Sequence, residues 1–187
     1  MNRHLKRAGL FLGTAAAALG FYLTVIQMTG NFATVVPGEV YRSNQPTSAD
    51  ITTYAARYNI RTIINLRGRH ETANWYKDEA AAATSLGLNL IDFPLQADRR
   101  LDPATAAKLL TVLRDAPRPI LIHCRSGADR TGLASVIYLA RIAKIDEETA
   151  ERQLSLRYGH IGVPFLSPTY AMDESWEDLE RAAGSAS

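Results

Sequence analysis

Residues 119–132 read Pro-Ile-Leu-Ile-His-Cys-Arg-Ser-Gly-Ala-Asp-Arg-Thr-Gly, and this stretch decides the fold. The segment from Pro119 to His123 is apolar and predicts an interior strand. A segment of helical character follows from Arg130 to about Ala143. A strand that passes through a short glycine-containing loop into a helix is the building unit of α/β folds with a parallel sheet.

The same alternation of strands and helices occurs on the N-terminal side of this stretch. Further strands are expected at residues 40–41, 61–66 and 89–94, and further helices at 48–58, 71–86, 102–115, 146–158 and 174–183. Asp102 and Pro103 are the expected N-cap and first turn of one of these helices. We therefore expect an α/β domain whose central, mostly parallel sheet of about four to five strands is flanked by helices. In such sheets ligands bind beyond the carboxyl ends of the strands.

The N-terminal segment is a separate physical unit. No charged residue occurs from Ala8 to Met28, and a helix of this length spans roughly 31 Å, close to the hydrocarbon thickness of a bilayer. The sequence thus predicts a transmembrane anchor over residues 1–29, a linker over 30–37 and a catalytic domain over 38–187. A cleaved signal peptide is the alternative, because residues 15–18 are small, but the apolar run continues beyond them.

The charges around this segment predict its orientation. Arg3, Lys6 and Arg7 precede the apolar run, and the next charged residues are Glu39 and Arg42. The positive-inside rule then places the N-terminus in the cytoplasm and the catalytic domain on the other side of the membrane. In a bacterium, the chain would cross the inner membrane once and carry its catalytic domain in the periplasm.

The composition is that of one ordinary globular domain, with 47% hydrophobic and 21% charged residues. A formal net charge of +2 without a Lys/Arg-rich run argues against a nucleic-acid partner. The single cysteine excludes an intrachain disulfide, and no Cys/His cluster has the spacing of a zinc site. We expect neither a metal nor another cofactor, and nothing in the composition indicates an oligomeric state.

The loop from Cys124 to Arg130, here called the phosphate loop, has the residues needed to bind and attack a phosphoryl group. Between a strand and a helix N-terminus, backbone N–H groups and the positive end of the helix dipole point toward one place and form an anion site. The positive electrostatic potential of these N–H groups and the helix dipole also favours a nucleophilic thiolate at Cys124. Arg130, six residues later, can return across the loop and hold two phosphate oxygens with its planar fork.

The neighbouring residues are expected to bind the substrate phosphate or to shape the loop around it. Gly127 lets the backbone approach the anion, and Gly132 lets the helix pack closely behind it. The Thr131 hydroxyl can donate to the sulfur and help it leave when a phosphocysteine is hydrolysed, and His123 is expected to orient the loop. The predicted binding set is Arg125, Ser126, Gly127, Ala128, Thr131, Gly132 and His123.

This stretch resembles the signature H-C-x5-R-[ST] of the cysteine-dependent protein tyrosine and dual-specificity phosphatase superfamily. The likeness extends from Tyr41 to about Ile142. Residues 41–46 (Tyr-Arg-Ser-Asn-Gln-Pro) and 63–67 (Ile-Ile-Asn-Leu-Arg) look like the opening elements of compact, bacterial-type members. The resemblance implies a dual-specificity phosphatase-like fold and a metal-independent phosphomonoester hydrolase that acts through a phosphocysteine intermediate.

The general acid departs from the commoner family pattern. Many relatives carry an aspartate on a loop before the nucleophile, which here is the segment containing Asp98. In this chain Asp129 lies inside the phosphate loop, as in an atypical bacterial subgroup with the pattern H-C-x2-G-x-D-R-T, where that aspartate is thought to be the acid. We predict Asp129 as the acid, with Asp98 as the alternative. Asp102 is better explained as a helix cap, and Asp92 is a weaker candidate.

Several arginines are expected near the predicted site and bear on the substrate. Arg67, Arg69, Arg99, Arg100 and Arg125 would form a basic rim suited to an anion larger than one phosphate. The substrate is then a phosphoprotein or an anionic phospholipid such as a phosphoinositide. A sulfurtransferase-like enzyme and a catalytically silent phospho-ligand-binding domain are the alternatives. The acid and nucleophile in one loop favour ester cleavage.

Two histidines have no matching family role. His70 and His160 are therefore expected to be structural or exposed.

Overall fold

In the computed structural model, which describes residues 3–184, the strand before Cys124 lies at the centre of a five-stranded sheet. β5 (Ile120–His123) pairs in parallel with β2 (Val40–Ser43) on one side and with β3 (Thr62–Asn65) on the other. β4 (Asn89–Asp92) is parallel to β3, and β1 (Ala33–Val36) closes the opposite edge antiparallel to β2. The order β1-β2-β5-β3-β4 confirms the predicted α/β class with a mostly parallel sheet.

The register aligns the carboxyl ends of the four parallel strands. Ser43 and Asn65 both pair with His123, and Asp92 pairs with Asn65. The segments that follow these strands therefore meet at one edge of the sheet, where Cys124 begins the phosphate loop.

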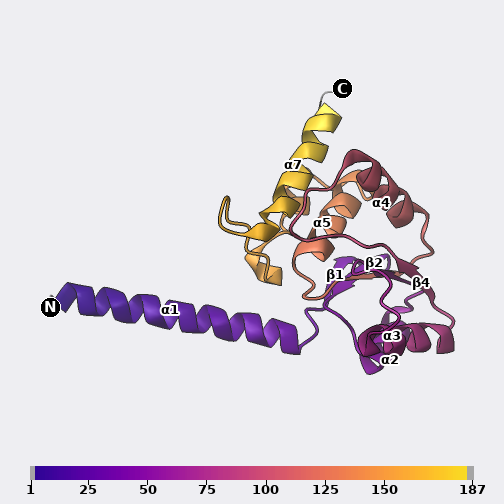
Figure 1. The fold of residues 1–187 in the computed structure, drawn as a ribbon, viewed down its shortest axis with the longest axis horizontal. Helices are drawn as coiled ribbons and strands as arrows, with labels where there is room; N and C mark the ends of the chain where they lie inside the picture. The colour runs from indigo at the N-terminus through magenta and orange to yellow at the C-terminus, as the bar shows by residue number, and fades with distance from the viewer. Residues whose placement is uncertain (1–2, 185–187) are drawn as a thin grey trace.

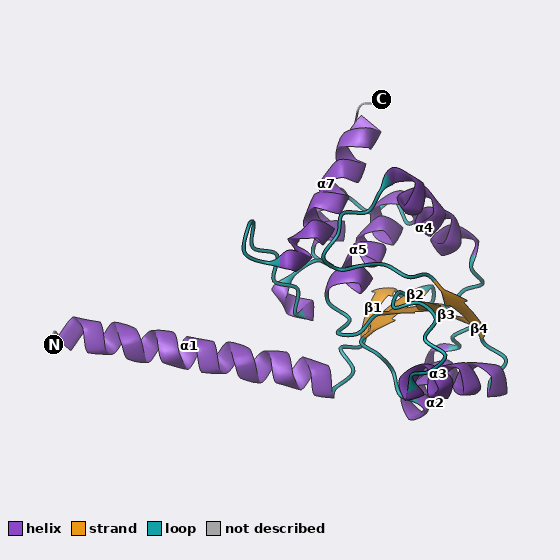
Figure 2. Cartoon of the chain, in the orientation of Figure 1, coloured by secondary structure: helices purple, strands orange, loops and turns teal. Residues whose placement is uncertain are grey.

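Helices cover both faces of the sheet (Figures 1 and 2). α2 (Ser48–Tyr58) and α3 (Asn74–Ser85) lie together on one face. α4 (Pro103–Asp115) and α5 (Asp129–Ile137) lie on the other, with α7 (Ala171–Gly184) packed against α5. The remaining elements are α1 (Arg3–Met28), the π-helical turn η1 (Tyr138–Ile142), α6 (Glu147–Glu151), and the 3₁₀ turns η2 (Leu156–Tyr158) and η3 (Pro168–Tyr170).

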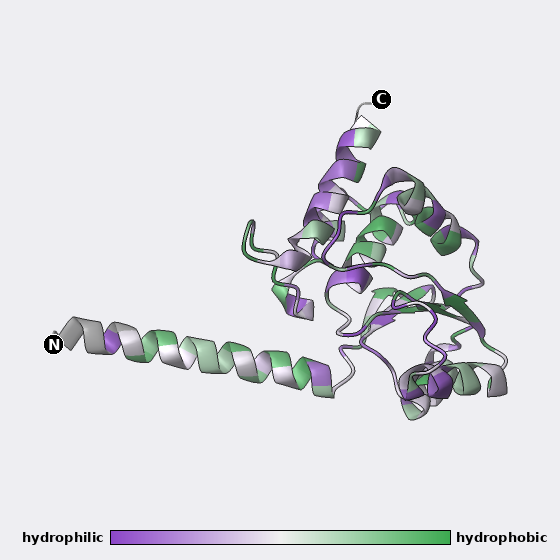
Figure 3. Ribbon diagram, in the orientation of Figure 1, coloured by the Kyte–Doolittle hydropathy of each residue, from purple (hydrophilic) through white to green (hydrophobic). Residues whose placement is uncertain are grey.

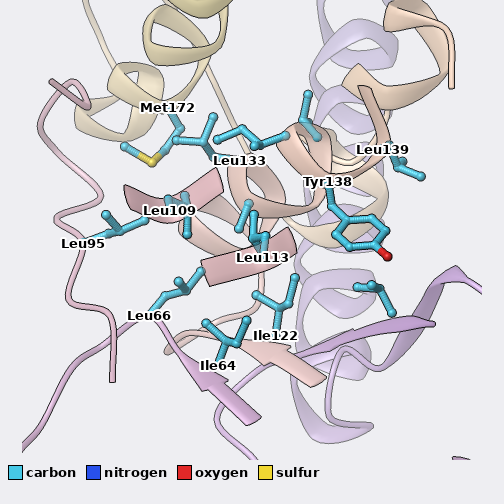
Figure 4. Packing of buried hydrophobic residues seen from close by; sticks show 14 of the residues in the cluster. Ile64, Leu66, Leu95, Leu109, Leu113, Ile122, Leu133, Tyr138, Leu139 and Met172 are labelled. Atoms are coloured by element: carbon cyan, nitrogen blue, oxygen red, sulfur yellow. The ribbon is translucent and has the colours of Figure 1, made fainter. Parts of the chain in front are cut away.

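Successive residues of each strand enter different hydrophobic clusters. Ile64 and Ile122 face the larger cluster beneath α4 and α5, where they pack with Leu109 and Leu133 (Figure 4). Ile63 enters a smaller cluster on the α2 and α3 face. Both faces are buried because helices cover both, as is typical of parallel sheets. Coloured by hydropathy, the sheet and the inner face of α5 are predominantly green (Figure 3).

The predicted helix starts have the expected caps. Thr47 accepts a hydrogen bond from the backbone of Asp50, and the two residues form a capping box at α2. Asp102 accepts from the Thr105 backbone at the start of α4, with Pro103 in the first turn. Asp102 is therefore a helix cap, as predicted.

Two expected boundaries were wrong. The predicted linker over residues 30–37 contains β1, whose residues Val35 and Val36 pack against the larger core cluster. The helix expected over residues 146–158 stops at Glu151 as α6. Beyond Glu151 the chain tightens, with the N–H groups of Gln153 and Leu154 donating to carbonyls three residues earlier, and the Gln153 carbonyl accepts from Arg42 in the core beneath the phosphate loop.

α1 extends away from the domain, with no buried residue in its apolar segment (Figure 1). The segment Gly9–Met28 is long and apolar enough to cross a membrane. The C-terminal turns of α1 contact the domain: Tyr22 and Gln27 donate hydrogen bonds to it, and Leu23 and Ile26 lie next to Gly159.

The tight packing behind the phosphate loop leaves no room for a side chain at Gly132. A Cβ at this position would lie 2.9 Å from the Gln153 carbonyl oxygen and 2.7 Å from a Leu154 methyl group. Gly132→Ala should therefore lower the free energy of unfolding by about 1–3 kcal/mol, measured by thermal unfolding of the full chain in detergent. Gly184→Ala is the matched control, since no atom of another residue in the described range 3–184 lies within 4 Å of its added Cβ. Equal stability of the two variants would contradict this packing.

Candidate active site

Cys124 lies directly after the central strand and is buried, at 1% exposure. α5 begins five residues later at Asp129, so the phosphate loop joins the centre of the sheet to a helix N-terminus as predicted. Gly127 has a positive φ of 73°, and a Cβ there would lie 2.7 Å from the Ser43 carbonyl oxygen. Only glycine therefore allows the loop to turn this closely over β2.

The carbonyl groups of the loop point outward to donors on neighbouring segments. The Arg125 carbonyl accepts from the Gln45 backbone at 3.2 Å. The Ser126 carbonyl accepts from the side-chain amides of both Gln27 and Asn31 at 2.9 Å. The N–H groups of Arg125, Ser126 and Gly127 donate no hydrogen bond to the described part of the chain. They are thus free to bind an anion.

Arg42 supports the loop from below and is completely buried. Its Nη2 atom donates to the Gly127 carbonyl at 2.6 Å, and its Nη1 atom donates to both the carbonyl and the side chain of Gln153. The guanidinium also lies over the Tyr158 ring, 3.8 Å from its centroid. Burial lowers the pKa of Arg42 to about 10, which still leaves it charged at neutral pH.

Two backbone carbonyl groups hold the guanidinium group of Arg130 in place. Its Nη1 atom donates to the carbonyls of Leu66 and Leu95, at 3.3 and 3.1 Å. Among residues 3–184, its buried Nε atom has no hydrogen-bond partner, and neither does the buried Thr131 hydroxyl. Because buried polar groups rarely remain unpaired in proteins, these donors indicate a site built for an external ligand.

His123 connects β5 to α3 and reaches the phosphate loop only through intermediate side chains. Its Nε2 atom lies 2.6 Å from an oxygen of Glu79, and both side chains are fully buried. Its Nδ1 atom has no partner within the described residues. The other Glu79 oxygen accepts from Gln45, whose amide oxygen in turn accepts from Arg67. The network orders the loop only indirectly, through the backbone of Gln45.

Asp129 lies next to Arg130 and is oriented by His160. The Nδ1 atom of His160 is 2.8 Å from Asp129, and its Nε2 atom is 2.9 Å from Asp173 at the start of α7. Burial lowers the pKa of His160, but the hydrogen bonds and charges of the two aspartates outweigh it and raise the pKa to about 9. His160 is therefore a buried, charged neighbour of the site, although the sequence offered no motif to reveal it.

The other candidate acids lie in different surroundings. Asp98 is exposed and lines a surface hollow with Phe165 and Leu166. Asp92 accepts from the Tyr76 hydroxyl at 2.5 Å and from the Asn65 amide at 2.9 Å. Asp92 thus has a structural role at the end of β4.

Only part of the expected basic rim forms. Burial lowers the pKa of Arg67, and the positive charges of Arg130 and Arg125 lower it further, which places these three guanidinium groups within electrostatic reach of one another. Arg67 also lies 3.5 Å from the centroid of the Trp75 ring. Arg69 instead pairs with Glu71, and Arg100 pairs with Asp178 and Glu174 on α7. Arg99 is exposed.

Comparison with known proteins identifies the family. Residues 26–153 match the family described as the tyrosine phosphatase family. The chain belongs to this family. It is thus a member of the cysteine-dependent tyrosine and dual-specificity phosphatase superfamily, which its sequence resembles.

Individual relatives of this phosphatase are distant. The dual specificity protein phosphatase TpbA from Pseudomonas aeruginosa (strain UCBPP-PA14) is 26% identical over 117 residues, which are 62% of this chain and 49% of TpbA. The phosphatase thus spans about half the length of this curated relative.

Solved structures share the fold of the phosphatase. A crystal structure of P. aeruginosa TpbA has a TM-score of 0.62 at 21% identity and covers 80% of this chain and 85% of its own. The catalytic core of the PP-IP phosphatase SIW14 from S. cerevisiae has a TM-score of 0.60 at 20% identity and covers 83% and 92%.

The charged state of His160 makes the stability of the phosphatase depend on pH. Because folding raises its pKa from 6.5 to about 9, its contribution is complete below about pH 6.5 and is lost as the pH rises through about 9. His160→Gln should therefore destabilise the protein at pH 6, on the order of 2 kcal/mol, and progressively less at alkaline pH. Thermal unfolding across this range measures the difference, with the exposed His70→Gln as control. A difference that stays constant with pH would refute the assignment.

Proposed function

We propose that this phosphatase hydrolyses phosphate monoesters through a phosphocysteine intermediate. The observation that carries the proposal is the set of unpaired donors around Cys124. The free N–H groups of Arg125, Ser126 and Gly127 and the buried Nε atom of Arg130 have no partner in the described chain. A phosphoryl group placed in the loop would satisfy them while its phosphorus faces the sulfur.

In the first step the Cys124 thiolate attacks phosphorus, a bond forms between sulfur and phosphorus, and the ester P–O bond breaks. Negative charge spreads over the equatorial oxygens, where the loop N–H groups and Arg130 stabilise it. Asp129 supplies a proton to the departing oxygen, so that an alcohol or phenol leaves.

In the second step water attacks the phosphocysteine and the sulfur–phosphorus bond breaks. Asp129, now a carboxylate, accepts the proton of the attacking water. The unpaired Thr131 hydroxyl donates to the departing sulfur and stabilises the thiolate. The products are inorganic phosphate and the free enzyme, with no metal or other cofactor required.

We assign the acid role to Asp129 because of its position. It is next to Arg130 at the start of α5, and the hydrogen bond from His160 fixes its carboxyl group. Asp98 is exposed and borders the hollow at Phe165 and Leu166. Asp98 remains the alternative acid.

The proposed substrate is a phosphoprotein or an anionic phospholipid such as a phosphoinositide. Arg67 and Arg125 add positive charge beyond the single phosphate site. We further propose that α1 anchors the enzyme in a membrane with its N-terminus in the cytoplasm, which in a bacterium places the catalytic domain in the periplasm.

Replacing the nucleophile tests the proposed chemistry. Cys124→Ser should lower turnover of an aryl phosphate by at least about 10⁴-fold, because a hydroxyl is a far weaker nucleophile at neutral pH. Binding of inorganic phosphate should largely persist, since the donors of the loop remain. Steady-state kinetics with and without a chelator, together with calorimetric phosphate binding, measure both effects. Turnover near that of the wild type would exclude the thiolate mechanism.

The dependence of the hydrolysis rate on the leaving group identifies the general acid. A general acid contributes about 10²–10⁴ in rate only where the leaving group needs a proton. Asp129→Asn should therefore impair hydrolysis of tyrosyl or alkyl phosphates much more than that of nitrophenyl phosphate, whose anion leaves readily. Asp98→Asn is the matched control and should show no such dependence in kcat/KM. The reverse pattern would assign the acid to Asp98.

A further inference from the structure

The segment between η2 and η3 exposes a continuous run of apolar side chains. Residues 161–166 read Ile-Gly-Val-Pro-Phe-Leu and are here called the apolar loop. Phe165 is fully exposed and Leu166 is 82% exposed, while Ile161 and Val163 are about two-fifths exposed. Phe165 also has a positive φ of 64°, which directs the chain sharply at this point.

This loop differs from the other exposed apolar residues of the catalytic domain. Leu86, Ile145 and Leu156 are each less than half exposed and do not form a run along the chain, which is ordinary in soluble proteins. The apolar loop instead places four large apolar side chains within six residues and contains no charge. Such a patch marks a surface that contacts a partner or a membrane.

The position of the loop favours a membrane as its partner. The chain just before the loop packs against α1. The Tyr22 hydroxyl donates to the Arg157 carbonyl at 2.5 Å. A Cβ added at Gly159 would lie 3.2 Å from the Ile26 side chain and 3.5 Å from the Leu23 side chain. Figure 1 shows the loop, in gold, projecting from the domain toward the side on which α1 extends. Figure 3 shows apolar green in both the loop and α1.

The contact with Tyr22 sets the height of the domain relative to a bilayer. Tyr22 is six residues before the end of α1 at Met28, which is about 9 Å along a helix. A transmembrane segment that ends at Met28 therefore holds the Arg157 carbonyl about 9 Å on the membrane side of that end, within the depth of one leaflet. The apolar loop begins two residues after Gly159, so its side chains can reach the same leaflet.

We propose that the apolar loop inserts into the membrane leaflet beside α1, so that the catalytic domain rests on the lipid bilayer at two places. This inference depends on the membrane anchor proposed above. The phosphate loop also lies beside the C-terminal end of α1, because Gln27 in α1 and Asn31 just after it both donate to the Ser126 carbonyl. The enzyme then takes substrate phosphates that are displayed close to the lipid surface.

The single cysteine of the chain permits a direct test in the full-length protein. Cys124→Ser removes the native thiol, and Phe165→Cys in this background provides one labelling site for an environment-sensitive fluorophore. The matched control is Thr53→Cys in the same background, on an exposed position of α2. Both labelled proteins are placed in lipid nanodiscs, and quenching by aqueous iodide and by nitroxide-labelled lipids is measured.

The proposal expects the fluorophore at position 165 to be quenched by the nitroxide lipids and to show a several-fold lower iodide quenching constant than the fluorophore at position 53. Equal iodide quenching at the two positions would overturn it. Protection from iodide without quenching by the nitroxide lipids would also overturn it, because protein would then cover the loop.

Extraction of cell membranes with alkaline carbonate separates the two proposals. Full-length wild-type protein that is released by carbonate would refute the anchor and the loop insertion together. Protein that stays in the membrane while position 165 remains open to iodide would refute only the insertion. Neither outcome bears on the phosphatase chemistry, which is measured separately on the wild-type enzyme.

Discussion

The structure of the site depends on satisfying the outward-facing carbonyl groups of the phosphate loop. A loop that turns successive N–H groups toward an anion must turn its carbonyls the other way, and each buried carbonyl then needs a donor. Gln45 bonds the carbonyl of Arg125, the amides of Gln27 and Asn31 bond that of Ser126, and Arg42 bonds that of Gly127. The N–H groups remain free for substrate because these donors hold the loop from outside.

This constraint explains why a charged residue lies in the interior. Arg42 brings donors to both Gly127 and Gln153 and stacks on Tyr158, so one side chain joins β2, the phosphate loop and the turn after α6. Loss of a partner of a buried charge costs far more than loss of a surface pair. The same reasoning corrects the domain boundary: Asn31 and β1 belong to the catalytic unit, and the match to the phosphatase family begins at residue 26. A soluble fragment that starts after residue 36 would lack them.

Features that depend on neighbouring residues could be predicted from the sequence. Contacts between residues far apart in the chain could not. The strands around Ile64 and Ile122 and the cap at Asp102 depend on neighbouring residues, so they could be predicted. His160 reaches Asp129 across 31 positions of the chain, and Glu79 reaches His123 across 44. Neither pair has a spacing signal. The turn after α6 is likewise held by a hydrogen bond between Arg42 and Gln153, two residues far apart in the sequence.

The central claim is that the phosphoryl group passes through the sulfur of Cys124, and trapping the intermediate tests it most directly. Wild-type enzyme mixed with excess nitrophenyl phosphate would be quenched in acid within the first turnover, and its peptides would be examined by mass spectrometry. The account predicts one covalent phosphate on the peptide that contains Cys124, and none on the same peptide of unreacted enzyme. Phosphate bound to a different residue during turnover, or turnover with no covalent phosphate at any time, would contradict it.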